Sequence, residues 1–259
     1  MDAERSALLA RLESSGYALL QPEVARVALQ LDLAALGNLR ESWERLPRDQ
    51  YLRDGGRYRA RRHSCFVQTP AVVQTAGAAL LPVPRRPHWQ PTAYNALHGG
   101  MERWFEPLEP AVSGSASWRQ LVSSLGELFA VLQPVSRWYI EAHQFRIDTS
   151  GGIGRPTPEG AHRDGVDFVA VVLAGRRAVL GGETRVFDAH GAVGVRFSME
   201  QPWSMLLMND ARVIHETTPI QPRERPDERT PPGVRDTLVL TYRAGGFQEP
   251  AGAGEGAGG

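Results

Sequence analysis

Two histidines and one aspartate are spaced so that they could hold a metal ion together. His162 and Asp164 lie two residues apart in PEGAHRDGVDFV, at the entrance to an apolar stretch. In extended chain the side chains at i and i+2 point to the same face, so this imidazole and this carboxylate can bind one cation. His215, in NDARVIHETTPI, lies far enough along the chain for a neighbouring strand to bring it back as a third ligand. The sequence predicts a metal site made of these three residues.

Such a ligand set leaves part of the metal's coordination sphere open. Two histidines and one carboxylate on one face of the ion are the arrangement of non-haem Fe(II) oxygenases. A 2-oxo acid can chelate at the open positions and leave a place for O2. The distal carboxylate of 2-oxoglutarate then needs a cation, and arginine binds carboxylates through two parallel hydrogen bonds. Arg235 begins the strand after His215 and is the predicted anchor; Arg243 is the reserve, and Arg223 lies in a charged loop.

Each of these signals also has a simpler structural interpretation. His and Asp often meet in loops, so an HxD triplet alone is weak, and a lone histidine on a strand is usually structural. The order of the features strengthens the prediction of a metal site. The HxD triplet precedes a buried strand, short strands follow, and a late histidine comes before an arginine that begins a strand.

The other reactive side chains carry weaker signals. Cys65 is the one cysteine of the chain, so it cannot form an internal disulfide. We expect it to be a packing residue in a reducing cytoplasm. His63, His88, His98 and His190 lie in segments rich in arginine, proline or glycine. We expect these histidines at the surface.

The second half of the chain is predicted to be a series of short strands. RWYIEAHQFRI alternates as a strand does, and VDFVAVVLA is rich in β-branched residues. Shorter strands are expected at ETRVFD, AVGVRF, WSMLLM, RVIHET and DTLVLTYR. Because no helix is expected between them, they favour a β-sandwich or barrel over alternating strands and helices.

The first half is predicted to be mainly helical. Tyr17–Leu20 is expected to be a short extended piece, and a helix near Trp118–Leu132 is expected to pack beneath a sheet. The predicted organisation is one domain over residues 1–247, helical to about residue 135 and β-rich from about residue 136. The proline- and charge-rich segment 221–234 is expected to be a mobile loop, and residues 248–259 a disordered tail.

Composition argues against several classes of function. Basic and acidic residues number 29 each, so no net charge attracts nucleic acid or an anionic membrane. The arginine-rich stretch 51–66 could grip phosphate groups, but such a run is more often a solvated strand or loop. No apolar run approaches the roughly 20 residues that cross a bilayer, and the N-terminus lacks the pattern of a signal peptide. We therefore expect a cytoplasmic protein that binds neither nucleic acid nor membrane.

Several strings of the sequence resemble the 2-oxoglutarate–iron dioxygenases typified by bacterial L-isoleucine 4-hydroxylase. They are YNALHGGMERWFEPL, HQFRI, PEGAHRDGVDFV, GGETRVFD, NDARVIHETTPI and RDTLVLTYR, with a looser match at GGRYRARRHSCF. The resemblance implies an α+β fold: a double-stranded β-helix core, jelly-roll or cupin-like, with an N-terminal helical region packed on the sheet. It also implies Fe(II), 2-oxoglutarate and O2, with His162, Asp164 and His215 on the iron and Arg235 on 2-oxoglutarate.

The resemblance further implies a small amino acid, or a derivative of one, as the substrate. The expected reaction is oxidation of an unactivated C–H bond, with hydroxylation as the leading outcome. Desaturation, cyclisation or rearrangement could follow at the same centre. Related halogenating enzymes have a small residue in place of the metal-binding carboxylate, so Asp164 argues against chlorination.

Four residues are candidates for binding such a substrate. Gln144 and Arg146 share one face of the strand HQFRI, and Arg146 could bind a substrate carboxylate or form a structural salt bridge instead. Glu159 and Asp167 flank the HxD triplet and could accept an ammonium group. His143 lies on the other face of the strand and is expected in the core.

Three other functions stay open at this point. A metal hydrolase or isomerase on a cupin-like barrel would use the same ligands for zinc or manganese and would not depend on 2-oxoglutarate. A degenerate β-helix could be a binding module without activity. A macromolecular substrate is the third alternative, and the balanced charge argues against it.

Overall fold

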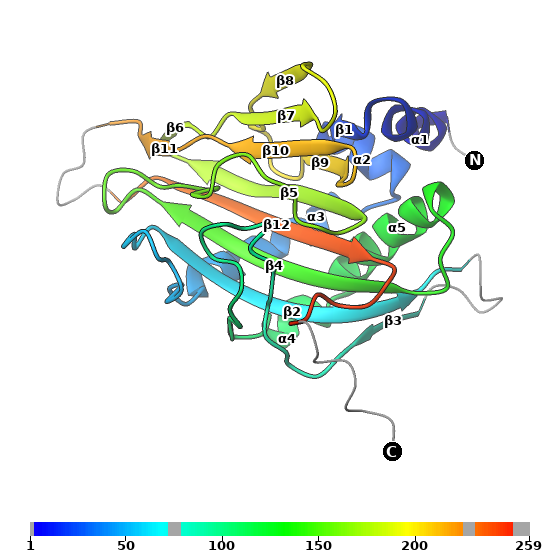
Figure 1. Ribbon diagram of the computed structural model, residues 1–259, viewed down its shortest axis with the longest axis horizontal. Coiled ribbons are helices and arrows are strands. Elements are labelled where there is room, and N and C mark those ends of the chain that lie inside the picture. The colour runs from blue at the N-terminus through cyan, green and yellow to red at the C-terminus, as the bar shows by residue number, and fades with distance from the viewer. Residues whose placement is uncertain (1–2, 72–78, 225–230, 251–259) are drawn as a thin grey trace.

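A curved antiparallel sheet of seven strands forms the centre of the computed structural model (Figure 1), which describes residues 3–71, 79–224 and 231–250. The strand order is β1-β9-β5-β12-β4-β2-β3, and two smaller sheets have the orders β10-β7-β8 and β11-β6. The main sheet comprises β1 (Tyr17–Leu20), β2 (Arg59–Thr69), β3 (Ala79–Pro82), β4 (Trp138–Asp148), β5 (Phe168–Arg177), β9 (Met205–Asn209) and β12 (Val234–Arg243). The smaller sheets comprise β6 (Val179–Gly181), β7 (Thr184–Asp188), β8 (Gly194–Phe197), β10 (Val213–Thr217) and β11 (Ile220–Pro222).

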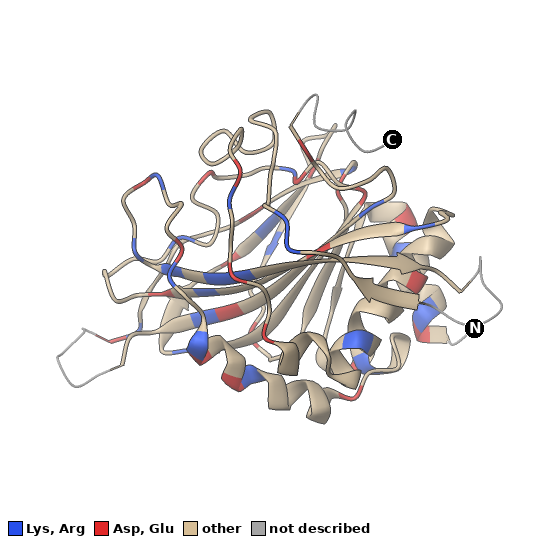
Figure 2. Ribbon diagram, turned by 90° about the horizontal axis from the view of Figure 1, so that it is seen from below, with Lys and Arg blue, Asp and Glu red and all other residues tan. Residues whose placement is uncertain are grey.

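Helices cover one face of the main sheet, and loops and the short strands lie over the other (Figures 1 and 2). The helices are α1 (Ala3–Ser15), α2 (Pro22–Ala28), α3 (Leu33–Gly37), the 3-10 helix η1 (Asn38–Arg45), α4 (Pro110–Ser113) and α5 (Ala116–Leu132). One hydrophobic cluster joins the helices to the sheet. A second cluster joins β5 and β9 to β7 and β10 on the opposite face.

The long helix α5 follows from its sequence. Its N-cap is Ser115, whose hydroxyl accepts a hydrogen bond from the backbone N–H of Trp118. The buried residues recur at intervals of three and four and form one apolar face. Two sheet residues bond to its backbone: Tyr242 donates to the carbonyl of Val122 at 2.8 Å, and Trp138 donates to the carbonyl of Gly126 at 3.0 Å.

The strand β4 shows how the sheet separates its two faces. Trp138, Ile140 and Ala142 belong to the cluster under the helices. Successive side chains of a strand point to opposite faces, so Glu141 and His143 must lie on the other side. Both line a cavity there. In this part of β4 the helical face is therefore apolar, and the ionisable residues lie on the face that forms the site.

The structure confirms the expected jelly-roll core of antiparallel strands, and each strand predicted in the second half is present. The first half differs from expectation because it also contributes β2 and β3 to the main sheet. The arginine-rich stretch is therefore not a solvated loop: Arg59 and Arg61 are 5% and 3% exposed. The predictions for the middle of the 221–234 loop and for most of the C-terminal tail lie outside the described residues. Among the described helices, none has the length and apolarity needed to cross a membrane.

We expect the packing of α5 on the sheet to dominate stability. Leu125 is fully buried, so Leu125→Ala should lower the free energy of unfolding by about 2–5 kcal/mol, because it removes apolar contacts and leaves a cavity. Val131 on the same helix is 43% exposed, and Val131→Ala should change it by less than about 0.5 kcal/mol. Denaturant unfolding of both variants measures the difference. Equal effects would show that the buried face of α5 does not contribute as described.

Candidate active site

The loop that carries His162 and Asp164 is held in place by Asp210. The carboxylate of Asp210 is fully buried and accepts hydrogen bonds from the backbone N–H groups of Asp164 (3.0 Å), Gly165 (2.8 Å) and Val166 (3.2 Å). Gly165 has a φ of +75°, and a Cβ there would lie 2.5 Å from the ring of Tyr94. Asp210 and Gly165 together therefore fix the turn that aims the Asp164 carboxylate.

His162 and His215 are brought together by their own backbones. They form an isolated antiparallel bridge in which each N–H donates to the other's carbonyl, at 3.0 and 2.9 Å. The Nδ1 of His162 lies 2.9 Å from the carbonyl of Gly160, which only an Nδ1–H can use as an acceptor. This tautomer leaves Nε2 of His162 with a free lone pair, as a metal ligand requires.

The three side chains converge at distances that suit a shared cation. Asp164 Oδ1 lies 3.7 Å from His162 Nε2, and Asp164 Oδ2 lies 3.9 Å from His215 Nε2. These separations are too long for hydrogen bonds. Two ligands about 2.1 Å from one metal ion are roughly 3–4 Å apart, depending on the angle between them. The residues present therefore fit a divalent metal ion.

The electrostatics of the group also favour a cation. Burial lowers the pKa of His162, but contact with Asp164 and the charge of Glu159 outweigh burial and raise it to about 10. Burial raises the pKa of Asp164, but the two histidines outweigh it and lower the pKa to about 2. Burial and the charge of His162 lower the pKa of His215 to about 4. Positive charge is thus favoured between these side chains, and a metal ion would replace the proton of His162.

Two further residues adjoin this group. Glu159 lines the cavity, with Oε1 3.6 Å from His162 Nε2 and Oε2 buried without a hydrogen-bond partner. Gln90 donates to Asp164 Oδ1 at 3.4 Å. Of the four predicted substrate ligands, Glu159 is the one that lines this cavity.

Arg235 lies in the same cavity with unused hydrogen-bond donors. It is 3% exposed, and its Nε and Nη2 are buried without a partner. In the described part of the chain no acid forms a salt bridge with it. Burial and the charge of Arg176 lower its pKa to about 10, so it stays protonated at neutral pH. A buried guanidinium without a partner is costly unless an anion binds to it. Arg235 therefore fits the distal carboxylate of 2-oxoglutarate.

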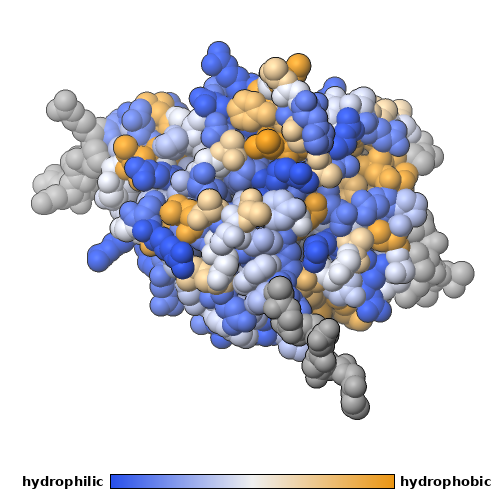
Figure 3. Space-filling view, viewed as in Figure 1, coloured by the Kyte–Doolittle hydropathy of each residue, from blue (hydrophilic) through white to orange (hydrophobic). Residues whose placement is uncertain are grey.

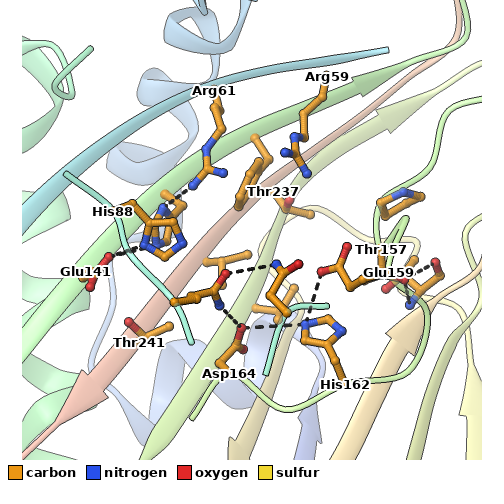
Figure 4. Close-up of a pocket in the computed structure, with 18 of the residues that line it drawn as sticks. Arg59, Arg61, His88, Glu141, Thr157, Glu159, His162, Asp164, Thr237 and Thr241 are labelled. Atoms are coloured by element: carbon orange, nitrogen blue, oxygen red, sulfur yellow. Dashed lines mark hydrogen bonds and ion pairs between the residues drawn. The ribbon is translucent and has the colours of Figure 1, made fainter. Parts of the chain in front are cut away.

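These groups share one cavity of about 130 Å³ on the loop-covered face of the sheet. Figure 4 shows His162, Asp164 and Glu159 on one side, with Arg59 and Arg61 reaching in from the other. Each water-sized position needs about 10–15 Å³, so the cavity suits small molecules.

The structure places three of the four predicted substrate ligands away from this cavity. Arg146 pairs with Asp236 at 2.7 Å and with Glu44 of η1, and Gln144 donates to Ser42 of η1 at 2.8 Å. Both lie on the helical face of β4. The alternation along HQFRI was predicted correctly, but the cavity faces the other set of side chains.

The other predicted residues also have structural partners. Asp167 accepts hydrogen bonds from Gln133 at 2.9 Å and from the backbone of Ala244 at 2.8 Å, outside the cavity. Arg243 donates to two backbone carbonyls near residue 246, and Arg223 is exposed. The prediction that Arg146, Gln144 and Asp167 bind substrate is therefore wrong, because structural partners hold them outside the cavity.

A second group of possible metal ligands was missed in the sequence. His63, His88, Glu141 and His143 are all buried, and their ligand atoms lie within 4.8 Å of one another. The prediction of surface positions is wrong for His63, His88 and His98, whereas His190 is exposed as predicted. Cys65 is buried, with Sγ 3.5 Å from His63 Nε2. The signal that could have found the group is the alternation of β4, which puts Glu141 and His143 on the same face.

The distances show that this second group is a carboxylate, that of Glu141, hydrogen-bonded to histidines and not spaced for a metal ion. Glu141 Oε2 lies 2.9 Å from His63 Nε2 and 2.6 Å from His88 Nδ1, which are hydrogen-bond lengths. Arg61 donates to Nδ1 of His143 at 2.7 Å, so a neutral His143 carries its proton on Nε2, the atom nearest Glu141. A metal-bound histidine normally donates through its other nitrogen instead. Burial lowers the pKa of His88 to about 3 and of His143 well below its usual value, which keeps both neutral.

Comparison with known proteins identifies the family. The family model described as 2OG-Fe dioxygenase matches residues 40–241. The chain belongs to this family. The dioxygenase is also similar to the crystal structure of a bsmA homolog from Methylobium petroleophilum PM1, with 55% identity, coverage of 97% of both chains and a TM-score of 0.89.

More distant structures share the fold of the dioxygenase. The structure of IDO from Bacillus thuringiensis is 18% identical, with coverage of 95% of this chain and 100% of that one and a TM-score of 0.73. The Fe(II)/(alpha)ketoglutarate-dependent dioxygenase TqaL is 17% identical, with coverage of 93% and 87% and a TM-score of 0.66. Comparison with curated proteins found no match. The family implies Fe(II), 2-oxoglutarate and O2 for this enzyme.

The two groups of ligands give opposite expectations for metal binding. The wild-type dioxygenase should bind one divalent ion per chain, and His162→Ala and His215→Ala should lose it, because each removes one of three ligands. Glu141→Gln should keep it. Metal analysis after anaerobic loading with Fe(II), or loading with Mn(II), and gel filtration measures the content. A second equivalent that His215→Ala retains and Glu141→Gln loses would show that the Glu141 group binds metal.

Proposed function

We propose that this dioxygenase oxidises an unactivated C–H bond of a small amino acid or an amino-acid derivative, most often by hydroxylation. In this proposal His162, Asp164 and His215 hold the iron, and Arg235 holds 2-oxoglutarate. The observation that carries it is the convergence of these four residues in one buried cavity, with unpartnered donors on Arg235. Membership of the 2OG-Fe dioxygenase family supports the cofactor and argues against a metal hydrolase or isomerase.

The protein's part in the reaction is to position and shield the reactants. Bound Fe(II) with 2-oxoglutarate and O2 supplies the oxidising chemistry, coupled to loss of CO2 and formation of succinate. Asp210 fixes the turn that carries Asp164, and the carbonyl of Gly160 holds the His162 ring in one tautomer. Arg235 orients the co-substrate from the floor of the cavity, and burial keeps water away from the reacting atoms.

An amino-acid substrate is supported by the charges of the cavity. Its walls carry positive charge, on guanidinium groups such as those of Arg59 and Arg61. They also carry negative charge, on the carboxylates of Glu141 and Glu159. A zwitterion needs both signs of charge. The cavity volume of about 130 Å³ suits a small molecule. Figure 3 shows hydrophobic residues scattered among hydrophilic ones on this face, without one extended apolar surface for a large partner.

Loss of Arg235 should weaken binding of 2-oxoglutarate specifically. Arg235→Gln removes two charge-assisted hydrogen bonds and should weaken binding by about 10- to 100-fold. Arg243→Gln is the matched control on the same strand, because its guanidinium bonds to backbone carbonyls outside the cavity. Anaerobic titration of the metal-loaded proteins with 2-oxoglutarate gives both affinities. An unchanged affinity in Arg235→Gln would remove this residue from the site.

The function is tested by succinate formation. Enzyme reconstituted anaerobically with Fe(II) and then given 2-oxoglutarate, O2 and a panel of L-amino acids should form succinate when its substrate is present. His215→Ala should form none. Product masses distinguish the outcomes: one added oxygen means hydroxylation, and two lost hydrogens mean desaturation or cyclisation. If no amino acid raises succinate above the His215→Ala level although iron and 2-oxoglutarate bind, the amino-acid substrate is wrong.

A further inference from the structure

Three buried arginines line the cavity, and Arg103 shares Gln90 as a hydrogen-bond partner with Asp164. Arg59 and Arg61 lie two residues apart on β2 and so share one face, and Arg103 comes from the irregular segment between β3 and α4. They are 5%, 3% and 2% exposed. Figure 4 shows Arg59 and Arg61 pointing into the cavity opposite His162 and Asp164. Arginine is rarely buried without a partner, so this wall requires an explanation.

Each of the three guanidinium groups has a buried N–H that nothing accepts. The unpartnered atoms are Nη2 of Arg59, Nε of Arg61 and Nε of Arg103. Leaving a buried charged donor unsatisfied costs more than leaving a neutral one. A set of unsatisfied donors around one cavity is what an anion-binding site has before its ligand arrives.

Other contacts hold these arginines rigidly. Arg59 donates to Asp49 at 2.7 Å, and Arg103 donates to Gln90 at 2.9 Å. Arg61 lies between two aromatic rings, 3.9 Å from the centroid of Phe105 and 4.3 Å from that of Phe145. Little side-chain entropy would therefore be lost when a ligand binds.

Of the three arginines, Arg103 has no direct ion pair in the described part of the chain. Asp49 pairs with Arg59 and lies 3.9 Å from Arg61, and Glu141 is bonded to histidines. Within the described ranges no salt bridge to Arg103 is found. Burial, followed by the charge of Arg59, lowers the pKa of Arg103 to about 10, so it remains positive at neutral pH. Asp49, Glu159 and Glu141 act on Arg103 only through their charges, so its free donor has no direct anionic partner, and a bound anion would supply one.

This wall is separate from Arg235. In the sheet, Arg59 pairs with Ile147 on β4, and Ile147 pairs with Arg235 on β12. Two strand spacings, about 10 Å, therefore lie between the Cα atoms of the two arginines. The cavity thus offers cations at two places, and a single carboxylate cannot use both.

We propose that Arg59, Arg61 and Arg103 form a second anion-binding subsite that holds the carboxylate of the primary substrate. This inference rests on the proposed function, because it names the group by which the substrate is recognised. The substrate carboxylate is then held by these three guanidinium groups, of which Arg59 and Arg61 lie opposite His162 and Asp164. Oxidation falls on a carbon away from that carboxylate.

The test compares acids with their neutral amides. Enzyme loaded with Mn(II) and 2-oxoglutarate does not turn over, so calorimetry can measure binding of the L-amino acid that best raises succinate, and of its carboxamide. The wild type should bind the acid at least about 10-fold more tightly than the amide. This comparison needs no variant, so it stands even if a buried arginine cannot be replaced without unfolding.

Variants then assign the preference to residues. Arg61→Gln and Arg103→Gln should each weaken binding of the acid by about 10- to 100-fold, leave binding of the amide nearly unchanged and leave 2-oxoglutarate affinity unchanged. Arg62→Gln is the matched control, because Arg62 is the next residue of β2 and donates to the carbonyl of Pro107 away from the cavity. A merely structural role of the arginines would weaken acid and amide alike. Equal losses in Arg61→Gln or Arg103→Gln, or an acid bound no better than its amide by the wild type, would overturn the subsite.

Failure of the subsite can be told apart from failure of the amino-acid substrate. If no amino acid raises succinate, the same calorimetry uses butyrate and hexanoate with their amides as probes. If these acids bind more tightly than their amides and Arg61→Gln and Arg103→Gln remove the difference, the subsite is supported and only the amino-acid substrate is wrong. Amino acids that react normally but show no preference for acid over amide would leave the function standing and remove the subsite.

Discussion

The alternation of side chains across the main sheet is the constraint on which the rest of the structure depends. On β4 and β12, one set of residues packs against the helices and the next set faces the cavity. The pairing of β4 with both β2 and β12 fixes this arrangement. A shift of one residue would turn Glu141 into the apolar layer beneath the helices, beside Ile140 and Ala142, where its charge would have no partner. The apolar face thus determines where the polar chemistry can lie.

The loop that carries His162 and Asp164 depends on a different interaction. His162 and Asp164 lie in irregular chain before β5, so no sheet ladder positions them. The backbone bridge to His215 and the buried carboxylate of Asp210 take its place. To accept these backbone hydrogen bonds, the carboxylate of Asp210 must be buried close to a second acid, Asp164. Burial and the charge of Asp164 raise its pKa to about 6. A cation between Asp164 and the histidines would relieve that repulsion, which couples the shape of the loop to occupation of the site.

Much of the fold could be predicted from the sequence, and so could the convergence of His162, Asp164 and His215, because both depend on local patterns. Alternation marks β4 and the strands after it, and HxD spacing marks His162 and Asp164. The rest depends on which face of a strand is covered, and periodicity does not reveal that. Gln144 and Arg146 were correctly paired but assigned to the wrong face, since only the packing of η1 shows where they point. For the same reason β2 was taken for a solvated segment: its arginines are buried only because β4 and residues 83–108 enclose them.

The row Arg59–Ile147–Arg235 has a consequence for how such an enzyme diversifies. Ile147 on β4 lies between Arg59 on β2 and Arg235 on β12, so an aliphatic side chain separates two cations from strands far apart in sequence. Under the proposed assignments, mutations in β2 or in residues 83–108 would alter which acid is accepted while the co-substrate anchor on β12 stays intact. Substrate range can then change while the reaction of 2-oxoglutarate with O2 stays intact, so a new specificity can arise without loss of activity.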